Sequence, residues 1–402
     1  MAKSKIITGL DIGSHSIKTL AVARKNGSQD LEFLGAVEIP SLGIRKGVVF
    51  DVEKVSNSVT EALGRLQQDI GRKIEDVYVN IGGSHIFSAP SRGTVIVSRA
   101  DRRISEEDVN RVVQAAQAFP MPLNNEILEV FPKEFIVDGQ GQIKEPRDMQ
   151  GLKLEAEVLA LCGFLPYKKN LAAAVLNANF QVLDVIPSCL ASSRAVLTSQ
   201  QKELGVCLLD IGAGTTDFMI YQEGDLSYAA VFPVGSSHIT NDLAVGFKID
   251  VELAEQIKKQ FGTCLAKSGN KKEKVETENN ETLIFSHKML VNIINARVCE
   301  IFDLAQKELK KICPQGMLPG GVVLTGGGAK LPRIVELAKK ELKLPARIGL
   351  PQGLEGLEKD PALSTVYGLV LSGGEDSGGE QRVIQRLSKG GIFKKIFKVF
   401  IP

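Results

Sequence analysis

Two stretches of the chain repeat one pattern, and this duplication constrains the fold more than any other feature of the sequence. The clearer copy is LGVCLLDIGAGTTDFMIY at residues 204–221, and the weaker copy is KIITGLDIGSHSIKTLAV at residues 5–22. In each copy an apolar run, typical of a strand buried on both faces, ends at an aspartate, Asp210 or Asp11. Glycine follows, and a second apolar run resumes the strand pattern. The sequence therefore predicts two related halves, each with a strand, a tight turn and a strand.

The predicted turns are suited to phosphate binding. Without bulky side chains, the backbone N–H groups of such a turn form a concavity for phosphate oxygens, and the hydroxyls of Ser14, Thr215 and Thr216 can add donors. The two aspartates would hold Mg²⁺ through water. A single D-x-G-x-G hairpin is more often an ordinary structural turn. Its recurrence about 200 residues later favours two hairpins that close on one triphosphate from opposite sides.

A glycine triplet predicts a second kind of nucleotide cradle. Gly326, Gly327 and Gly328 directly follow an apolar strand pattern and precede a helical pattern. Glycines at such a position let the backbone approach a flat ligand, as an adenosine would need. A lone GGG is weak evidence, but its position about 110 residues after the second hairpin is more informative than its composition.

Composition excludes several classes of protein. The 402 residues are 44% hydrophobic with a net charge of +2, which allows two to four units with a sizeable core and gives no global sign of nucleic-acid binding. The six cysteines have no CxxC spacing, which predicts buried thiols in a reducing cytosol rather than a metal site. The chain enters a strand pattern near its start, and no apolar run approaches the roughly 18 residues of a membrane span. We therefore expect neither secretion nor a transmembrane helix.

The pattern along the chain predicts an inserted subdomain that has no counterpart in the second half. The insert should contain a helix at residues 105–119, capped by Ser105 and Asp108. A polar charged segment at residues 266–282 is expected to be a solvated loop, with a partner contact as the alternative, and residues 285–312 to be a long amphipathic helix. The expected domain bounds are 1–83 and 161–199 for the first half, 84–160 for the insert, 200–235 and 313–372 for the second half, and 236–312 for a nucleotide- and partner-binding subdomain.

The C-terminal residues predict a membrane-binding helix on a flexible tether. Residues 373–389 begin with a glycine-rich polar stretch typical of a tether, and residues 390–402 read GGIFKKIFKVFIP. On a helix, the apolar side chains fall within about 160° of one another, and the lysines occupy the opposite face. About 11 residues at 1.5 Å each give roughly 17 Å, too short for a bilayer core of about 30 Å, so the helix would lie on the membrane. The residues expected at the membrane are Ile392, Phe393, Lys394, Lys395, Ile396, Phe397, Lys398, Val399 and Phe400.

Charge supports this prediction. Residues 381–402 carry six Lys or Arg side chains and no acidic one, a charge of +6. The net charge of +2 minus +6 leaves −4 for the remainder of the chain. The alternative, a terminal helix that packs on the protein body, is disfavoured by three phenylalanines and a lysine face behind a glycine-rich tether.

Together these motifs resemble the actin, chaperone and sugar-kinase ATPase superfamily. The resemblance rests on the two hairpins, on PSCLASSRAVL at residues 187–197 and on LTGGGAKLP at residues 324–332. Within the superfamily, LDIGSHSIK, ELGVCLLDIGAGTTD, CLASSRAVL, the insert and the C-terminal helix resemble the FtsA family of bacterial cell-division proteins. The resemblance implies an α/β fold with a duplicated actin-like, ribonuclease H-like two-domain ATPase core. It also implies that the usual second subdomain is missing and that an α+β subdomain is inserted elsewhere.

The resemblance also implies roles for individual residues. Asp11 and Asp210 would orient Mg²⁺ and the attacking water, and Lys18 would contact phosphate. Glu255 and Lys258 would contact the adenosine opposite the glycine triplet, although by themselves they are more typical of a solvated helix face. His15 stands where the family pattern has a small residue. The residues expected along the phosphates are Gly13, Ser14, His15, Lys18, Gly212, Ala213, Gly214, Thr215, Thr216 and Gly235.

The function implied by the resemblance is that of a membrane adaptor. An ATP- and Mg²⁺-binding, polymerising protein with slow or no ATPase activity would tether FtsZ filaments to the cytoplasmic face of the cell membrane at the division septum. The insert would bind other division proteins. An acidic C-terminal peptide of FtsZ would dock on the subdomain of the long helix, where Arg297 is equally consistent with an ordinary surface charge. The candidate contacts are Asn295, Arg297, Lys307, Lys310 and Lys311.

Two other classes of function share this core. An assembly ATPase of a pilus or secretion system could also share the insert, and the C-terminal amphipathic helix distinguishes the adaptor from it. A small-molecule kinase would need a positioned carboxylate base and a sugar pocket, and the sequence gives no signal for either.

Overall fold

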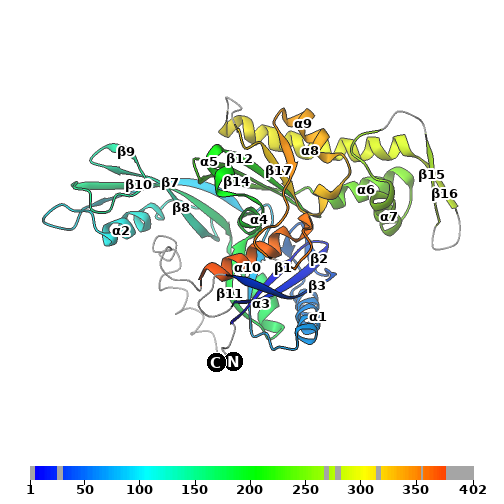
Figure 1. The fold of residues 1–402 in the computed structure, drawn as a ribbon, viewed down its shortest axis with the longest axis horizontal. Helices are drawn as coiled ribbons and strands as arrows, with labels where there is room; N and C mark the ends of the chain where they lie inside the picture. The colour runs from blue at the N-terminus through cyan, green and yellow to red at the C-terminus, as the bar shows by residue number, and fades with distance from the viewer. Residues whose placement is uncertain are drawn as a thin grey trace.

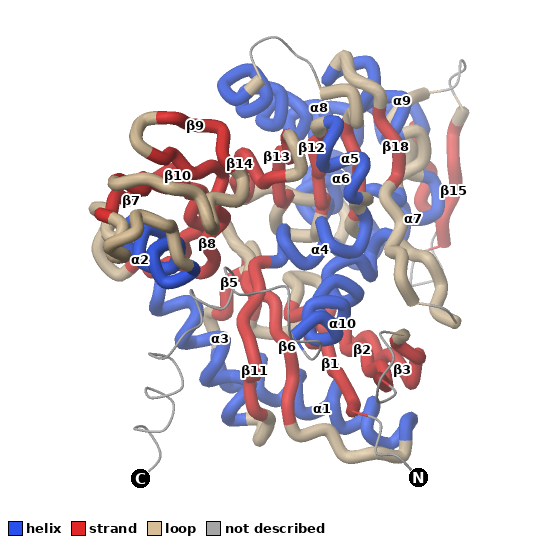
Figure 2. Tube along the Cα trace, turned by 60° about the vertical axis from the view of Figure 1, so that its left-hand side comes forward, coloured by secondary structure: helices blue, strands red, loops and turns tan. Residues whose placement is uncertain are grey.

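The structure is a computed structural model, and it describes residues 5–24, 30–266, 271–276, 282–313, 318–354 and 356–376. Two halves lie one above the other in Figure 2, each built on its own β-sheet, and a third unit projects from one side in Figure 1. The residues predicted to form the membrane helix, 390–402, lie outside the described part of the chain.

The first half is a five-stranded sheet in the order β11-β6-β1-β2-β3. Helices α1 and α3 cover one face of this sheet, and α4 and α10 lie on the other. The elements are β1 (Lys5–Ile12), β2 (Ser16–Arg24), β3 (Leu31–Pro40), the short strands β4 (Ile44–Arg45) and β5 (Val48–Val49), α1 (Val52–Ile70), β6 (Asp76–Ile81), α3 (Leu165–Asn177), β11 (Gln181–Pro187), α4 (Ser188–Val196) and α10 (Ser364–Asp376).

Helix α1 shows how local sequence sets these elements. The side chain of Asp51 accepts a hydrogen bond from the backbone N–H of Lys54 and starts the helix. Val55, Val59 and Leu66 recur at helical spacing and are buried against the sheet. The cap and the apolar spacing, both local features of the sequence, thus account for this helix.

The second half contributes five strands to a nine-stranded sheet in the order β18-β17-β12-β13-β14-β7-β10-β8-β9. A subdomain of helices α6, α7 and α8 with a two-stranded ribbon extends from it (Figure 1). The elements are α5 (Ser199–Leu204), β12 (Val206–Ile211), β13 (Thr216–Gln222), β14 (Asp225–Phe232), α6 (Ser236–Phe247), α7 (Val251–Phe261), β15 (Lys272–Glu276), β16 (Thr282–Ser286), α8 (His287–Ile312), β17 (Val322–Thr325), the 3₁₀ turns η1 (Gly327–Lys330) and η2 (Pro361–Leu363), α9 (Ile334–Leu342) and β18 (Ala346–Ile348).

The remaining four strands of the large sheet belong to the insert. Its elements are β7 (Phe87–Ile96), α2 (Glu106–Ala116), β8 (Asn125–Val137), β9 (Gln140–Ile143) and β10 (Lys153–Phe164). Helix α2 begins with the predicted capping box, in which Ser105 and Asp108 exchange hydrogen bonds. The sequence missed β9, a four-residue edge strand.

The insert is joined by chain to the first half but by hydrogen bonds to the second. Strand β7 pairs with β14 at Phe87 and Ala230. Beside this pair, the Ser88 hydroxyl both donates to the carbonyl of Ala229 at 2.9 Å and accepts from its N–H at 3.0 Å. The insert's sheet is therefore a continuation of the second half's sheet, which the order of elements along the chain did not suggest.

Three predicted elements need correction. The segment 266–282, expected to be a solvated loop, contains β15, because Val275 and Phe285 bury their side chains and pair β15 with β16. The long helix consequently begins at His287 rather than at residue 285. Between the two halves, residues 188–204 form two helices rather than one, because Leu197 is extended and Thr198 caps the second helix. Residues 373–376, expected in the tether, complete α10.

Helices α4 and α10 join the two halves through a very close contact. A Cβ atom added at Gly368 in α10 would lie 1.7 Å from the carbonyl oxygen of Ala191 in α4. Only glycine lets the two backbones approach this closely. The contact places α10, whose chain follows the second half, on the sheet of the first half.

We predict that Gly368→Ala will lower the free energy of unfolding by about 1–3 kcal/mol, because the added methyl group must push the two helices apart. The matched control is Gly64→Ala in α1, where an added Cβ meets nothing within 4 Å. That change should raise the free energy of unfolding by about 0.5–1 kcal/mol through helix propensity. Denaturant unfolding of both variants measures whether each change lowers or raises the free energy of unfolding. Equal changes in the two variants would contradict the close packing of α4 and α10.

Candidate functional site

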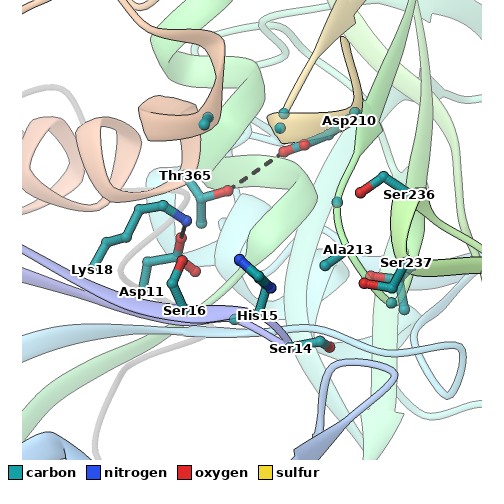
Figure 3. A pocket seen from close by; sticks show the side chains of 18 of the residues that line it. Asp11, Ser14, His15, Ser16, Lys18, Asp210, Ala213, Ser236, Ser237 and Thr365 are labelled. Carbon is teal, nitrogen blue, oxygen red and sulfur yellow. Dashed lines mark hydrogen bonds and ion pairs between the residues drawn. The ribbon is translucent and has the colours of Figure 1, made fainter. Parts of the chain in front are cut away.

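The two aspartate hairpins face each other across one cavity of about 660 Å³. Figure 3 shows Asp11, Ser14 and His15 on one side and Asp210, Ala213, Ser236 and Ser237 on the other. The cavity residues that the sequence predicted are Asp11, Gly13, Ser14, His15, Lys18, Asp210, Gly212, Ala213, Gly214, Thr215, Glu255, Lys258, Gly326, Gly327 and Gly328. The structure thus brings residues up to about 300 positions apart to one place.

The first hairpin pairs an aspartate with a lysine. Asp11 and Lys18 are cross-strand partners of β1 and β2, and the Lys18 Nζ lies 3.8 Å from Asp11 Oδ2 and 3.9 Å from Glu38 Oε1. Burial raises the pKa of Asp11, and the charge of Lys18 opposes that rise. The turn itself is closed by a hydrogen bond from the N–H of Gly13 to the carbonyl of Ser16 at 3.1 Å.

The second hairpin pairs two aspartates instead. Asp210 and Asp217 are cross-strand partners of β12 and β13. The pKa of Asp210 is raised to about 6, chiefly by burial and also by the negative charge of Asp11, while hydrogen bonds from Ser192 and Thr365 oppose the rise. Thr365 donates to Asp210 Oδ2 at 3.4 Å, as Figure 3 shows.

Asp217 is a cavity residue that the sequence reasoning missed. It is 6% exposed, its Oδ1 has no hydrogen-bond partner, and burial followed by the charges of Asp210 and Asp11 raises its pKa. The Oδ1 of Asp217 is therefore left to accept a hydrogen bond from a group in the cavity. The duplicated pattern could have identified Asp217. It pairs with Asp210 in the second hairpin as Lys18 pairs with Asp11 in the first.

Glu255 and Lys258 form a buried network on the wall opposite the glycine triplet. Lys258 is 8% exposed, and its Nζ lies 2.6 Å from Glu255 Oε2 and donates to Thr240 Oγ1 at 2.8 Å. A solvated helix face, the alternative interpretation of these two charges, is therefore wrong for Lys258. Across the cavity, Gly326 has φ 82°, and a Cβ there would lie 2.3 Å from Asp210 Oδ1, so only glycine is tolerated.

Two predicted phosphate contacts lie outside the cavity. Thr216 is fully buried, and its hydroxyl donates to the carbonyl of Val234 at 2.8 Å, so it is not a free phosphate donor. Gly235 lies behind the second turn, because a Cβ there would be 2.6 Å from the carbonyl oxygens of Gly212 and Ala213. Gly235 therefore supports the turn rather than lining the cavity. Besides Asp217, the sequence reasoning missed these cavity residues: Glu38, Asn80, Ser188, Lys330, Asp360 and Thr365.

The residues predicted to contact a partner peptide all lie on α8: Asn295, Arg297, Lys307, Lys310 and Lys311. Three of them have side-chain partners within the chain, and one of the three is Lys311, which donates to Glu308 Oε1 at 2.7 Å. The Arg297 guanidinium donates to both carboxylate oxygens of Asp242, at 2.7 and 2.9 Å, and also to Glu300. The Asn295 amide donates to the carbonyl of Cys264 at 3.0 Å. A peptide carboxylate would have to compete with Asp242 for Arg297.

The cavity suits a Mg²⁺–nucleotide complex. Asp11, Asp210 and Asp217 supply hard oxygen ligands, and glycine turns leave backbone close to the cavity on both sides. Within the described residues, no three His, Cys, Asp or Glu side chains are arranged as a metal cage. A Mg²⁺ ion here would therefore take most of its ligands from water and phosphate, as Mg²⁺ usually does.

Solved structures with the same fold define the class of protein. The chain aligns with a PilM–PilN type IV pilus biogenesis complex at a TM-score of 0.64, 16% identity, and 91% and 98% coverage of the two chains. It aligns with MreB5 of Spiroplasma citri bound to ADP at a TM-score of 0.56, 14% identity, and 96% and 99% coverage. The protein therefore has the actin-like ATPase fold.

Sequence relatives define the family. A family model described as cell division protein FtsA matches residues 207–368, and one described as an SHS2 domain inserted in FtsA matches residues 83–162. FtsA of Borreliella burgdorferi is 38% identical over 91% of this chain and 90% of its own, and FtsA of Pseudomonas aeruginosa is 36% identical over 92% and 89%. The chain belongs to the FtsA family of cell-division proteins. Among the described residues no helix is long and apolar enough to cross a membrane.

We predict that Asp210→Asn will stabilise the nucleotide-free protein at neutral pH. Because the folded-state pKa of Asp210 is raised from 3.8 to about 6, its contribution to stability is fully present below about pH 4 and is lost as the pH rises through about 6. Asparagine removes this loss, so the variant should gain on the order of 2 kcal/mol at pH 7.5 and little at pH 4.

Thermal unfolding at both pH values, without nucleotide or divalent cation, measures this difference. Asp69→Asn, an exposed change on α1, is the control and should show no such pH dependence. An Asp210→Asn variant less stable than the parent at pH 7.5 would show that the carboxylate is not strained by burial.

Proposed function

We propose that this protein binds ATP with Mg²⁺ in the cavity between its halves. The observation that carries the proposal is the pair of aspartate hairpins that face each other across one cavity, with a glycine triplet beside them. The resemblance in fold to MreB5 of Spiroplasma citri, which is bound to ADP in its structure, supports this choice of ligand. The bound Mg²⁺ would neutralise phosphate charge and join the two hairpins.

Different residues around the cavity would bind the phosphates and the cation. Backbone N–H groups of the Gly13–Ser14 and Gly212–Gly214 turns would donate to phosphate oxygens. Asp11 and Asp210 would hold the water shell of the cation, and Lys18 would exchange its contact with Asp11 for one with phosphate. Burial keeps these carboxylates strained until a cation arrives.

ATP would chiefly control conformation and assembly, with hydrolysis slow or absent. Each half contributes one aspartate hairpin to the cavity. A triphosphate bound to both hairpins would therefore fix the angle between the halves. The actin-like fold supports a proposal of self-association into filaments. The structural likeness to PilM favours a pilus assembly ATPase as the second candidate, but sequence relatives along nearly the whole chain are cell-division proteins.

We further propose that the protein tethers FtsZ filaments to the cytoplasmic membrane face at the division septum. The long-helix subdomain would hold an acidic FtsZ peptide, with the α8 lysines as point charges and Arg297 exchanging its Asp242 partner. The insert would offer a separate surface to other division proteins.

The C-terminal segment would supply the membrane contact, and its strength argues for assembly. Each buried apolar side chain contributes roughly 1.5–3 kcal/mol when burial is complete, and each lysine about 1 kcal/mol near anionic lipid. Ordering about 11 residues costs on the order of 1 kcal/mol or more apiece, so one helix binds modestly and reversibly. A filament that carries many copies would gain avidity without any new contact.

We predict that Asp210→Ala will weaken Mg-ATP binding at least about tenfold, because it removes a carboxylate from the cation's water shell. Titration with a fluorescent ATP analogue in Mg²⁺ buffer measures this, and Asp69→Ala on the exposed face of α1 is the matched control. Unchanged nucleotide affinity in the Asp210→Ala protein would refute the role assigned to that residue.

Deletion of residues 390–402 should abolish sedimentation with anionic liposomes and leave ATP binding intact. The same assay with FtsZ added, with and without ATP, tests the whole adaptor: FtsZ should reach the pellet only with the full chain. Liposome binding that survives the deletion would disprove the anchor. Phosphate transfer to a small acceptor would instead identify a kinase.

A further inference from the structure

A buried asparagine beside the first aspartate makes a set of hydrogen bonds that the proposed nucleotide binding does not by itself explain. Asn80 ends β6 next to β1 and is 5% exposed. Its Oδ1 accepts from the backbone N–H of Ile12 at 2.7 Å. Its Nδ2 donates to Asp11 Oδ1 at 2.8 Å and to the Ser188 hydroxyl at 3.1 Å. Since a backbone N–H can only donate, the orientation of the amide is fixed.

This arrangement makes the two oxygens of Asp11 different. Oδ1 accepts a charge-assisted hydrogen bond from Asn80, while Oδ2 faces the Lys18 ammonium at 3.8 Å. Asp11 therefore cannot rotate about its Cβ–Cγ bond without breaking the Asn80 bond. Asp210 is held differently, by hydroxyl groups rather than an amide: Thr365 donates to its Oδ2 at 3.4 Å, and Ser192 is its other donor.

The chain of hydrogen bonds continues to the helix that joins the halves. The Ser188 hydroxyl donates to the carbonyl of Ile81 at 3.1 Å, so its lone pair is left to accept from Asn80. Ser188 is the first residue of α4, which packs against α10. The N-terminus of α4 is thus connected to Asp11 through one amide.

We propose that Asn80 is a positioning residue for the cation: it holds Oδ1 of Asp11 so that Oδ2 alone is presented to Mg²⁺ and its water shell. The inference rests on the proposed Mg-ATP site and assigns a role to a residue that the motif does not contain. A fixed acceptor oxygen lowers the entropy lost when the hydrated cation binds. Asn80 donates to Asp11, so it would act on a bound cation through this carboxylate.

The test separates metal dependence from nucleotide affinity in the full chain. ATP affinity is measured by titration at a series of Mg²⁺ concentrations and again in EDTA. Asn80→Ala should raise the Mg²⁺ concentration for half-maximal ATP affinity by about tenfold and leave the affinity in EDTA within about twofold. Asn57→Ala, an exposed asparagine on α1, is the matched control and should change neither value.

Ser188→Ala provides a second variant, because it removes the acceptor of the other Asn80 N–H, together with the hydroxyl's bond to Ile81, and leaves the Asn80–Asp11 bond in place. It should shift the Mg²⁺ requirement in the same direction by about threefold. If Asn80→Ala fails to fold, an unchanged Mg²⁺ requirement in Ser188→Ala overturns the proposal. So does an equal loss of affinity with and without Mg²⁺ in Asn80→Ala, which would indicate a general structural defect. Failure of the unaltered chain to bind ATP would instead refute the proposed function.

Discussion

Three carboxyl groups are buried close together in the cavity between the two halves, and this is the main physical constraint on the structure. Asp11, Asp210 and Asp217 line one cavity, and Lys18 pairs with only the first of them. Burial raises the pKa of all three carboxyl groups, so each is less favourable as an anion here than in water. Cross-strand pairing holds Asp11 beside Lys18 and Asp210 beside Asp217, so the strands fix this cluster in place.

The scaffold around the seam connects it to the rest of the molecule. Thr365, which donates to Asp210, lies at the start of α10, and α10 then crosses the sheet of the first half in close contact with α4. On the other side, the insert extends the second half's sheet through β14 and β7, although its chain leaves and rejoins the first half. If the angle between the halves changed, the insert would therefore move with the second half, relative to the first half from which its chain leaves. The cavity is thus connected to α10 through Thr365, and the insert is connected to the second half through β7 and β14.

Sequence patterns predicted the elements whose cause is local. The Ser105 capping box, the strand at residues 76–81 and both aspartate hairpins were found because their signals lie within a few neighbouring residues. The failures share one cause, which is a partner distant in sequence. Strand β15 was taken for a loop because its alternation is only meaningful beside β16. Thr216 was taken for a phosphate donor because nothing nearby shows that Val234 occupies its hydroxyl.

The sequence by itself determined the duplication, the fold class, the family resemblance and the two aspartate turns and glycine triplet of the cavity. These are encoded in short motifs, in which residue type and spacing fix the geometry of a turn or a helix end. Tertiary structure alone decided that Asp217 lacks a donor, that Lys258 is buried, and that Asn80 fixes one oxygen of Asp11. The physical reason is that burial and hydrogen-bond partnership depend on which distant segments meet. Residues 11, 80 and 188 become neighbours only when β1, β6 and α4 pack together.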